Sequence, residues 1–289
     1  MLFKGKVVKI LAGKYWVLEG NTQYLCSARG ALRNTDQEIL VGDNVSFEKA
    51  EIPGRIIDVL PRKNYLVRPP VANIDDVLIV VAKEPKPDFV LVDKILINSY
   101  SQRIRPILCY NKIDLVDPTE VDSALSGYGQ ILDTIAVSAE TGFGLSEIEN
   151  LIKGRSVCLA GQSAVGKTSM LNAILGLNLK TGELSDKIKR GKNTTRHVEI
   201  FKALGAEIVD TCGFSMLENL KIHESELGYY YPDFLDYSER CRFKGCTHIS
   251  EPSCGVKEAV EKGLVDKERY ERYIKIYNEI KDSREKEFS

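Results

Sequence analysis

The strongest constraint on the fold is an eight-residue segment in the middle of the chain, Gly161-Gln-Ser-Ala-Val-Gly-Lys-Thr168. It fits the pattern G-x-x-x-x-G-K-[ST], follows the apolar run SVCLA and precedes a helical stretch. Its two glycines let backbone N–H groups face phosphate oxygens, and the N-terminus of the helix attracts negative charge. A strand, this loop and a helix in succession predict a nucleotide-binding α/β domain.

Two side chains of this phosphate loop have predicted roles. Lys167 can bridge β- and γ-phosphate oxygens and is also a candidate catalytic group, and the Thr168 hydroxyl can bind Mg²⁺. The other predicted nucleotide contacts lie in the loop and the first helical turn, at Gly161, Gln162, Ser163, Ala164, Val165, Gly166 and Ser169.

Two segments upstream of the phosphate loop predict that the base is guanine. N-K-I-D at 111–114 follows the apolar run IRPILCY, and S-A-E-T-G at 138–142 follows TIAV. Guanine offers N1–H and N2–H₂ donors, so the Asp114 carboxylate can accept from both. We expect Asn111 to serve the O6/N7 edge, Lys112 to cover the ring, and Ser138 and Ala139 to close the pocket with a backbone N–H to O6. Each segment alone is a weak signal, but together with the phosphate loop they favour guanine over adenine.

Two segments downstream of the phosphate loop are predicted to respond to the γ-phosphate. In D-T-C-G at 210–213, Asp210 can reach Mg²⁺ through water and the Gly213 N–H can bind the γ-phosphate. Residues 180–202 hold 7 Lys+Arg against 3 Asp+Glu, and their apolar residues follow no clear helical or strand period, which predicts a mobile loop. Thr194 and Thr195 within it are candidates for a Mg²⁺-binding threonine.

These five segments are those of a GTPase in an unusual order. The usual order is phosphate loop, threonine, D-x-x-G, N-K-x-D and S-A, whereas here the last two come first. We therefore predict a circularly permuted GTPase domain over 69–221. Apolar runs at 76–82, 104–110, 131–137, 156–160 and 207–209 alternate with helical stretches at 89–102, 120–126, 145–152 and 167–175. This alternation predicts a parallel sheet with helices on both faces.

Residues 1–68 predict a small β-barrel. Five short runs at 6–11, 15–18, 23–27, 44–48 and 55–59 are rich in β-branched or aromatic residues, a pattern that fits a five-stranded OB-fold. The segment carries 11 Lys+Arg against 7 Asp+Glu, which favours RNA binding. Tyr15, Trp16 and Tyr24 either stack on bases or, more commonly for strand aromatics, pack in the barrel.

Residues 222–289 predict a zinc-binding, mostly α-helical domain. Cys241-x4-Cys246-x-His248-x5-Cys254 supplies three thiolates and an imidazole, a closed ligand set for one structural Zn²⁺ per chain. The following tail repeats apolar and aromatic residues at helical spacing, at Tyr270, Tyr273, Ile274, Tyr277 and Ile280, which predicts the packing face of a helix with Asp266 as its N-cap.

Composition indicates in which cellular compartment the chain is expected. Its 289 residues carry a formal net charge of −1, and no apolar run approaches the ~20 residues of a membrane span. The N-terminus is interrupted by lysine and glycine and does not resemble a signal peptide. We expect a cytoplasmic monomer with no membrane partner.

The permuted order, the N-terminal barrel and the C-x4-C-x-H-x5-C set together resemble the ribosome small subunit-dependent GTPase A family, over essentially the whole chain. The resemblance implies an OB-fold, a permuted GTPase and a zinc domain. It further implies binding to the 30S subunit and its 16S rRNA late in maturation, with subunit-stimulated hydrolysis of GTP to GDP and phosphate.

Two departures from the family pattern leave the catalytic group open. The family's G-R-H-T-T-T is G-K-N-T-T-R here, so Asn193 replaces the proposed catalytic histidine, and its D-T-P-G-F has Cys212 in place of proline. Phe214 stands where many GTPases carry a water-orienting glutamine. Thr195, His197 and Lys167 remain catalytic candidates. A GTP-binding RNA scaffold with negligible hydrolysis is the alternative, and Asp114 disfavours an ATP-using kinase or ATPase.

Overall fold

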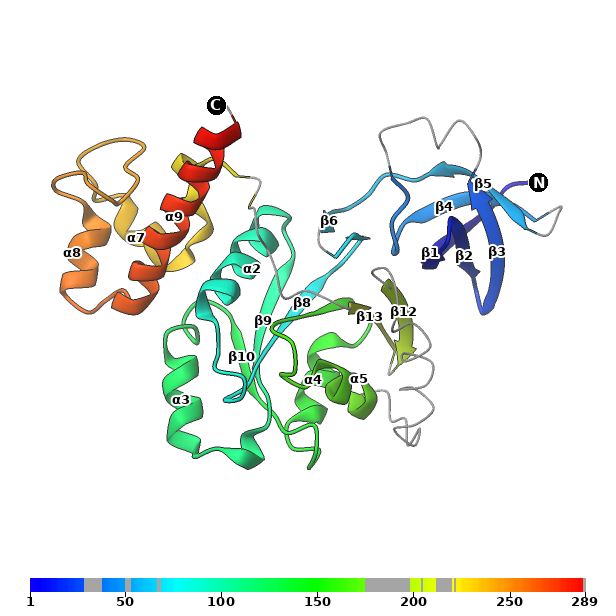
Figure 1. The fold of residues 1–289 in the computed structure, drawn as a ribbon, viewed down its shortest axis with the longest axis horizontal. Coiled ribbons are helices and arrows are strands. Elements are labelled where there is room, and N and C mark those ends of the chain that lie inside the picture. The colour runs from blue at the N-terminus through cyan, green and yellow to red at the C-terminus, as the bar shows by residue number, and fades with distance from the viewer. Residues whose placement is uncertain are drawn as a thin grey trace.

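The computed structural model describes residues 1–28, 38–49, 53–66, 69–174, 198–203, 205–211, 220 and 222–287. A small barrel and a helical domain flank a central α/β domain on opposite sides (Figure 1).

The N-terminal barrel has five strands. They are β1 (Phe3–Leu11), β2 (Lys14–Glu19), β3 (Thr22–Ala28), β4 (Asn44–Glu48) and β5 (Gly54–Val59). The strand order is β1-β2-β3-β5-β4, and pairing of β1 with β4 closes the barrel. Alternate residues such as Val7, Val17 and Ile56 fill its interior. The predicted five-stranded barrel is confirmed, and Tyr15, Trp16 and Tyr24 are half-buried against hydrophobic cores.

The central domain is built on parallel strands with the order β10-β9-β8-β11-β13. These are β8 (Asp76–Val81), β9 (Arg105–Tyr110), β10 (Asp133–Ala136), β11 (Ser156–Ala160) and β13 (Ala206–Thr211). Side chains of β8 alternate between two cores. Val77, Ile79 and Val81 pack with α2 (Phe89–Ser101) and α3 (Pro118–Ser126), whereas Leu78 and Val80 pack with α4 (Leu145–Ile152) and α5 (Lys167–Ile174). The predicted sheet with helices on both faces is confirmed.

One part of the sheet differs from the sequence prediction. The sequence predicts a loop over residues 180–202, but Val198–Ala203 form strand β12, which pairs antiparallel with β13. Val198 and Ile200 are buried in the central core while Glu199 between them is half-buried, so the segment has the two-residue period of a strand. The count of basic residues over the whole segment concealed this short alternation. Residues 175–197 lie outside the described part.

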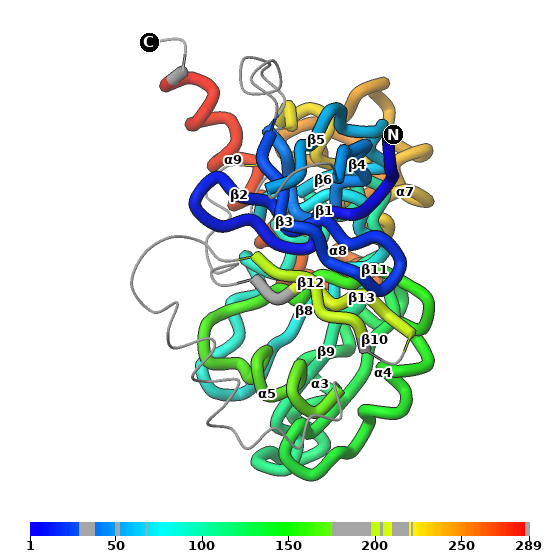
Figure 2. The backbone as a smooth tube through the Cα atoms, turned by 90° about the vertical axis from the view of Figure 1, so that its right-hand side faces the viewer, coloured from blue at the N-terminus to red at the C-terminus, as the bar shows by residue number. Residues whose placement is uncertain are grey.

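Strand β12 joins the barrel to the central domain. It pairs antiparallel with β1, so the barrel and the α/β domain share one sheet of eleven strands (Figure 2). Lys6 of β1 forms an ion pair with Glu207 of β13, and Lys9 of β1 forms one with Glu199 of β12. Although burial opposes ionisation, hydrogen bonds from Lys6 and Ser156 hold the pKa of Glu207 below its ordinary value.

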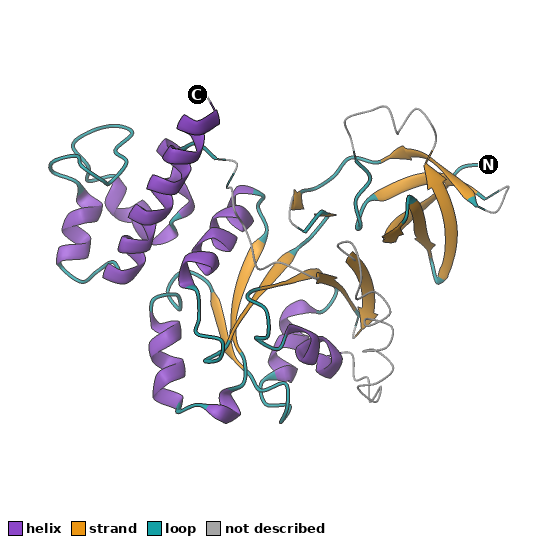
Figure 3. Ribbon diagram, viewed as in Figure 1, coloured by secondary structure: helices purple, strands orange, loops and turns teal. Residues whose placement is uncertain are grey.

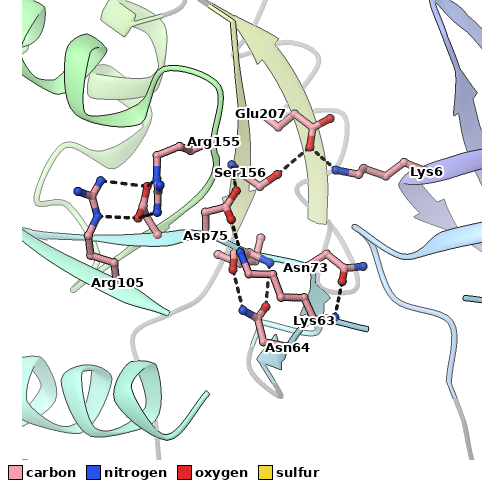
Figure 4. A network of polar contacts seen from close by, with 11 residues as sticks. Lys6, Lys63, Asn64, Asn73, Asp75, Arg105, Arg155, Ser156 and Glu207 are labelled. Atoms are coloured by element: carbon pink, nitrogen blue, oxygen red, sulfur yellow. Dashed lines mark hydrogen bonds and ion pairs between the residues drawn. The ribbon is translucent and has the colours of Figure 1, made fainter. Parts of the chain in front are cut away.

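The connection between barrel and sheet is held by polar contacts (Figure 4). It contains the short strands β6 (Tyr65–Leu66) and β7 (Val71–Ala72). Asn64 exchanges two hydrogen bonds with the Ile74 backbone, and Asp75 accepts from the Ser156 N–H and from Lys63. These contacts fasten the connection to the start of strands β8 and β11.

The C-terminal domain is helical. It contains a 3₁₀ helix, η2 (Glu224–Tyr230), and the α-helices α7 (Pro232–Ser238), α8 (Gly255–Glu261) and α9 (Lys267–Glu287). The predicted stripe of α9 faces the domain core, with Tyr273 and Ile280 buried. Asp266 Oδ1 accepts from the Arg269 N–H at 2.7 Å, which confirms the predicted N-cap. Among the helices that the structure describes, none is both long and apolar enough to cross a bilayer.

Candidate nucleotide-binding site

Four loops meet at one end of the parallel sheet. They follow β8, β9, β10 and β11, and they begin near Lys83, Asn111, Ser138 and Gly161 (Figure 3). Because the carboxyl ends of parallel strands lie at one edge of a sheet, the segments that the sequence singled out separately form one site.

The phosphate loop requires glycine at two positions. Gly161 and Gly166 have φ angles of +122° and +96°, which side-chain-bearing residues rarely adopt. A Cβ at Gly161 would collide with the Val80 carbonyl oxygen, and one at Gly166 would collide with the Asn111 amide. Both glycines therefore permit a close approach between neighbouring loops. Lys167 Nζ turns back over the loop and donates to the Gly161 carbonyl oxygen at 2.8 Å.

Asn111 connects three of the four loops. Its side chain is 1% exposed. Its Nδ2 donates to the Val165 carbonyl oxygen of the phosphate loop at 2.9 Å, and its Oδ1 accepts from the Ala139 N–H at 3.1 Å. The predicted contact of Asn111 with the O6/N7 edge stays a prediction; its amide binds protein groups on both sides here.

The side chains around the predicted base pocket are also ordered by hydrogen bonds. Asp114 is exposed, and its Oδ1 accepts from the buried Ser138 hydroxyl at 2.5 Å. Ser138 Oγ in turn accepts from the Thr141 N–H. Lys112 Nζ donates to the carbonyl oxygens of Glu84 and Ala164, so this side chain extends from the base loop to the phosphate loop. Asp114 therefore presents a carboxylate of fixed orientation.

The segments predicted to bind Mg²⁺ and the γ-phosphate are only partly described. The backbone of Asp210 lies in β13, beside the phosphate-loop strand β11, and Thr168 is exposed in the first turn of α5. Thr194, Thr195, His197 and Gly213 lie outside the described residues, as do Asn193, Cys212 and Phe214. Their roles stay predictions.

The sequence did not indicate that the loop after β8 belongs to the site. Gln162 Oε1 accepts from the Asp88 N–H at 2.9 Å, and Gln162 Nε2 donates to the Lys86 carbonyl oxygen at 3.1 Å. The only local signal was a pair of prolines in K-E-P-K-P directly after a buried strand. The partners are more than 70 positions apart, so no local pattern pairs them.

A second site lies in the C-terminal domain. Cys241, Cys246, His248 and Cys254 bring one ligand atom each to within 4.8 Å of one another. Cys241 Sγ lies 3.8 Å from Cys254 Sγ, and His248 Nδ1 lies 3.4 Å from Cys254 Sγ. In a tetrahedral zinc site with bonds of about 2.0–2.3 Å, neighbouring ligand atoms are roughly 3.5–3.8 Å apart. The cluster can hold a metal ion, and the two distances to Cys254 Sγ are close to this spacing.

Hydrogen bonds from nearby residues hold this ligand loop. The Glu251 carboxylate accepts from the Thr247 and Ile249 N–H groups, and although burial opposes ionisation, hydrogen bonds from Thr247 lower the pKa of Glu251 to about 2. Tyr270 and Tyr273 of α9 donate to the carbonyl oxygens of His248 and Thr247, each at 2.6 Å. The loop is therefore fixed to the long helix, as expected of a structural site.

Comparison with protein families and known proteins agrees with this geometry. A family model described as RsgA GTPase matches residues 59–220, and one described as RsgA N-terminal domain matches residues 4–53. The chain is 43% identical over 287 residues to a small ribosomal subunit biogenesis GTPase RsgA from Geobacillus sp. (strain WCH70), covering 96% of this chain and 98% of the relative. It is 39% identical over 290 residues to a protein of the same name from Caldanaerobacter subterraneus subsp. tengcongensis, covering 99% and 98%.

Solved structures show the same arrangement. The crystal structure of YjeQ from Thermotoga maritima superposes with a TM-score of 0.83 at 36% identity, covering 97% of this chain and 99% of that one. The structure of YloQ, described as a circularly permuted GTPase, superposes with a TM-score of 0.79 at 32% identity, covering 98% and 96%.

Proposed function

This chain belongs to the RsgA GTPase family, and on that premise we propose that it binds the 30S ribosomal subunit late in maturation and hydrolyses GTP there. The names of the relatives, which refer to small ribosomal subunit biogenesis, support this subunit as the partner. The basic barrel supports contact with 16S rRNA. We place domain boundaries near residues 68 and 221, and we expect a cytoplasmic monomer.

One observation carries the enzymatic part of the proposal. Asn111 binds the phosphate loop with one end of its amide and the Ala139 loop, also predicted to contact the base, with the other. The groups that would bind the phosphates and those that would bind guanine are therefore held in one rigid unit. Such positioning supplies much of the catalysis of phosphoryl transfer.

The residues present also suit two metal ions. We propose one structural Zn²⁺ on Cys241, Cys246, His248 and Cys254, because four protein ligands leave no open position for water. We further propose that Mg²⁺ enters with GTP and is held by the Thr168 hydroxyl and, through water, by Asp210. In hydrolysis, Lys167 and the backbone N–H groups of the phosphate loop would stabilise charge on the phosphate oxygens.

GTP hydrolysis with and without 30S subunits tests this function. The carbon side chain of Phe214 cannot orient water, and Asn193 replaces the family's candidate histidine. We therefore expect slow hydrolysis by the free protein and stimulation of roughly 10³-fold or more by the subunit, the size of effect that a missing stabilising group has in this chemistry. Binding of GTP without stimulated turnover would favour the alternative, a GTP-binding RNA scaffold.

Binding to the subunit should depend on the basic side chains of the barrel. Lys4, Lys14 and Arg55 are exposed on its strands. Replacing all three with glutamine should weaken 30S binding at least about tenfold, and the slope of log affinity against log salt should fall by about 0.7–0.9 for each phosphate that the barrel no longer neutralises. Filter binding at several salt concentrations measures both quantities.

The control for this prediction removes the same charge from the central domain. Lys83, Arg103 and Lys153 are exposed there, and the triple glutamine variant should retain the salt slope of the parent. Equal weakening of 30S binding in the two triple variants would mean that net charge, and not the barrel surface, determines binding.

A further inference from the structure

Helix α2 has two packed faces. Leu91, Val92, Ile95 and Leu96 are buried in the core beneath the parallel sheet. The other face of the helix, with Val90, Asp93, Lys94 and Ile97, contacts the C-terminal domain. The same helix therefore belongs to the hydrophobic packing of both domains, and Figure 1 shows it between the sheet and α9.

The start of α2 is bonded to the nucleotide loops. Asp88 caps the helix by accepting from the Leu91 N–H, and the Asp88 N–H itself donates to Gln162 Oε1 in the phosphate loop. Gln162 Nε2 donates to the Lys86 carbonyl oxygen, and Lys112 of the base loop donates to the Glu84 carbonyl oxygen. Three hydrogen bonds thus fix the segment that leads into α2.

One and a half turns later, the helix is bonded to α9. Asp93 is fully buried. Its Oδ1 accepts from Arg269 Nη1 at 2.5 Å and from the Tyr128 hydroxyl at 3.0 Å, and its Oδ2 accepts from Arg272 Nε at 2.6 Å. Arg269, 1% exposed, also donates to Asp233 of α7. Buried charges with several partners tolerate little displacement, because each broken bond leaves an unpaired charge.

The two ends of this connection are close. Asp88 and Asp93 are five positions apart along the helix, a rise of about 7.5 Å. Lys167, whose ammonium group would bind phosphate, also donates to the Gln162 carbonyl oxygen. Phosphate oxygens would compete for this ammonium group and so change the contacts of the residue that holds the start of α2.

From these contacts we propose that α2 couples the nucleotide site to the C-terminal domain, with Gln162 as the contact at the phosphate loop and Asp93 as the contact at α9. This inference rests on the proposed function only in requiring that the chain binds a guanine nucleotide. The position of α9 then depends on the occupancy of the phosphate loop through a helix of the central domain.

Hydrogen–deuterium exchange on the full-length protein tests the coupling. We expect saturating GDP or a non-hydrolysable GTP analogue to slow exchange over residues 267–280 of the parent roughly fivefold or more, the lower end of typical allosteric couplings. Gln162→Met removes both hydrogen-bonding groups at nearly constant length, and at saturating nucleotide it should abolish this response. Gln102→Met, the same change at the far end of α2, should retain it.

A second variant tests the other end. Arg272→Gln removes one of the two arginines from Asp93 and should also abolish the response. Because coupling is reciprocal, a variant that uncouples α9 from the nucleotide site should also change in nucleotide affinity. An undiminished response in either variant would overturn the proposal, and in Arg272→Gln it would point instead to η2, which contacts α9 through an ion pair between Glu224 and Arg284.

The outcomes separate this inference from the proposed function. If the parent binds no guanine nucleotide by calorimetry, the proposed function fails. If the parent binds and hydrolyses GTP while exchange in α9 does not respond, the coupling alone is wrong.

Discussion

Asp114→Asn should lose the preference for guanine nucleotides. The Ser138 hydroxyl donates to Asp114 Oδ1, so an asparagine that keeps its oxygen toward Ser138 would point its NH₂ group at the N1–H and N2–H₂ donors of guanine. Buried polar groups that face each other as donors cost several kcal/mol, and we expect GTP affinity to fall roughly 10⁴-fold. Calorimetric titration with GTP, XTP and ATP measures this change.

The same variant should gain affinity for xanthosine triphosphate (XTP). Xanthine carries a carbonyl oxygen in place of the N2 amino group, so an asparagine donor would match it and affinity for XTP should rise. Asp117→Asn is the matched control, because Asp117 caps α3 three residues further on and asparagine is an equally good N-cap. Parent-like GTP binding by Asp114→Asn, with ATP still rejected, would show that Asp114 does not recognise the base.

Removing the metal should unfold the C-terminal domain. We expect one Zn²⁺ per chain in protein purified without chelators, and chelation should lower the melting temperature and abolish the protection of α9 from exchange. Zinc binding supplies small zinc domains with about 10–16 kcal/mol of apparent free energy at neutral pH, more than the net stability expected of a domain of this size. Metal analysis and melting curves before and after chelation measure both effects.

Two cysteine variants sharpen the zinc prediction. Cys254→Ser removes a buried ligand and should abolish stoichiometric zinc binding. Cys26→Ser changes a fully buried thiol of the barrel and should leave the metal content unchanged. Protein without zinc, or a melting curve that chelation does not alter, would contradict the structural role of the metal.

Local chemistry made much of this protein predictable. The phosphate loop needs positive φ angles at Gly161 and Gly166, and glycine is the residue that adopts them without strain. The four metal ligands lie within 14 residues, so chain geometry alone brings them together. Strands and helices of the central domain followed from apolar runs that alternate with helical stretches, and the permuted order followed from the order of the segments along the chain.

The links between these units came only from the tertiary structure. Lys6 pairs with Glu207 across 201 positions, and Asp93 pairs with Arg269 across 176. In sequence, Asp93 reads as an ordinary polar position on a helix, and nothing local distinguishes it from a solvated carboxylate. Its partners were decided by which face of α2 the C-terminal domain covers, because a buried charge must be paired by whatever cation the packing brings to it.

The same distinction separates the nucleotide site from its surroundings. The sequence by itself determined which loops are predicted to bind the base and the phosphates, because those predictions depend on residue type and short spacing. Only the tertiary structure decided that Asn111 joins the loops, that Gln162 holds the start of α2, and that β12 pairs with the barrel. Each of these is a contact between segments distant in sequence, and such contacts depend on how whole elements pack and not on the pattern within any one of them.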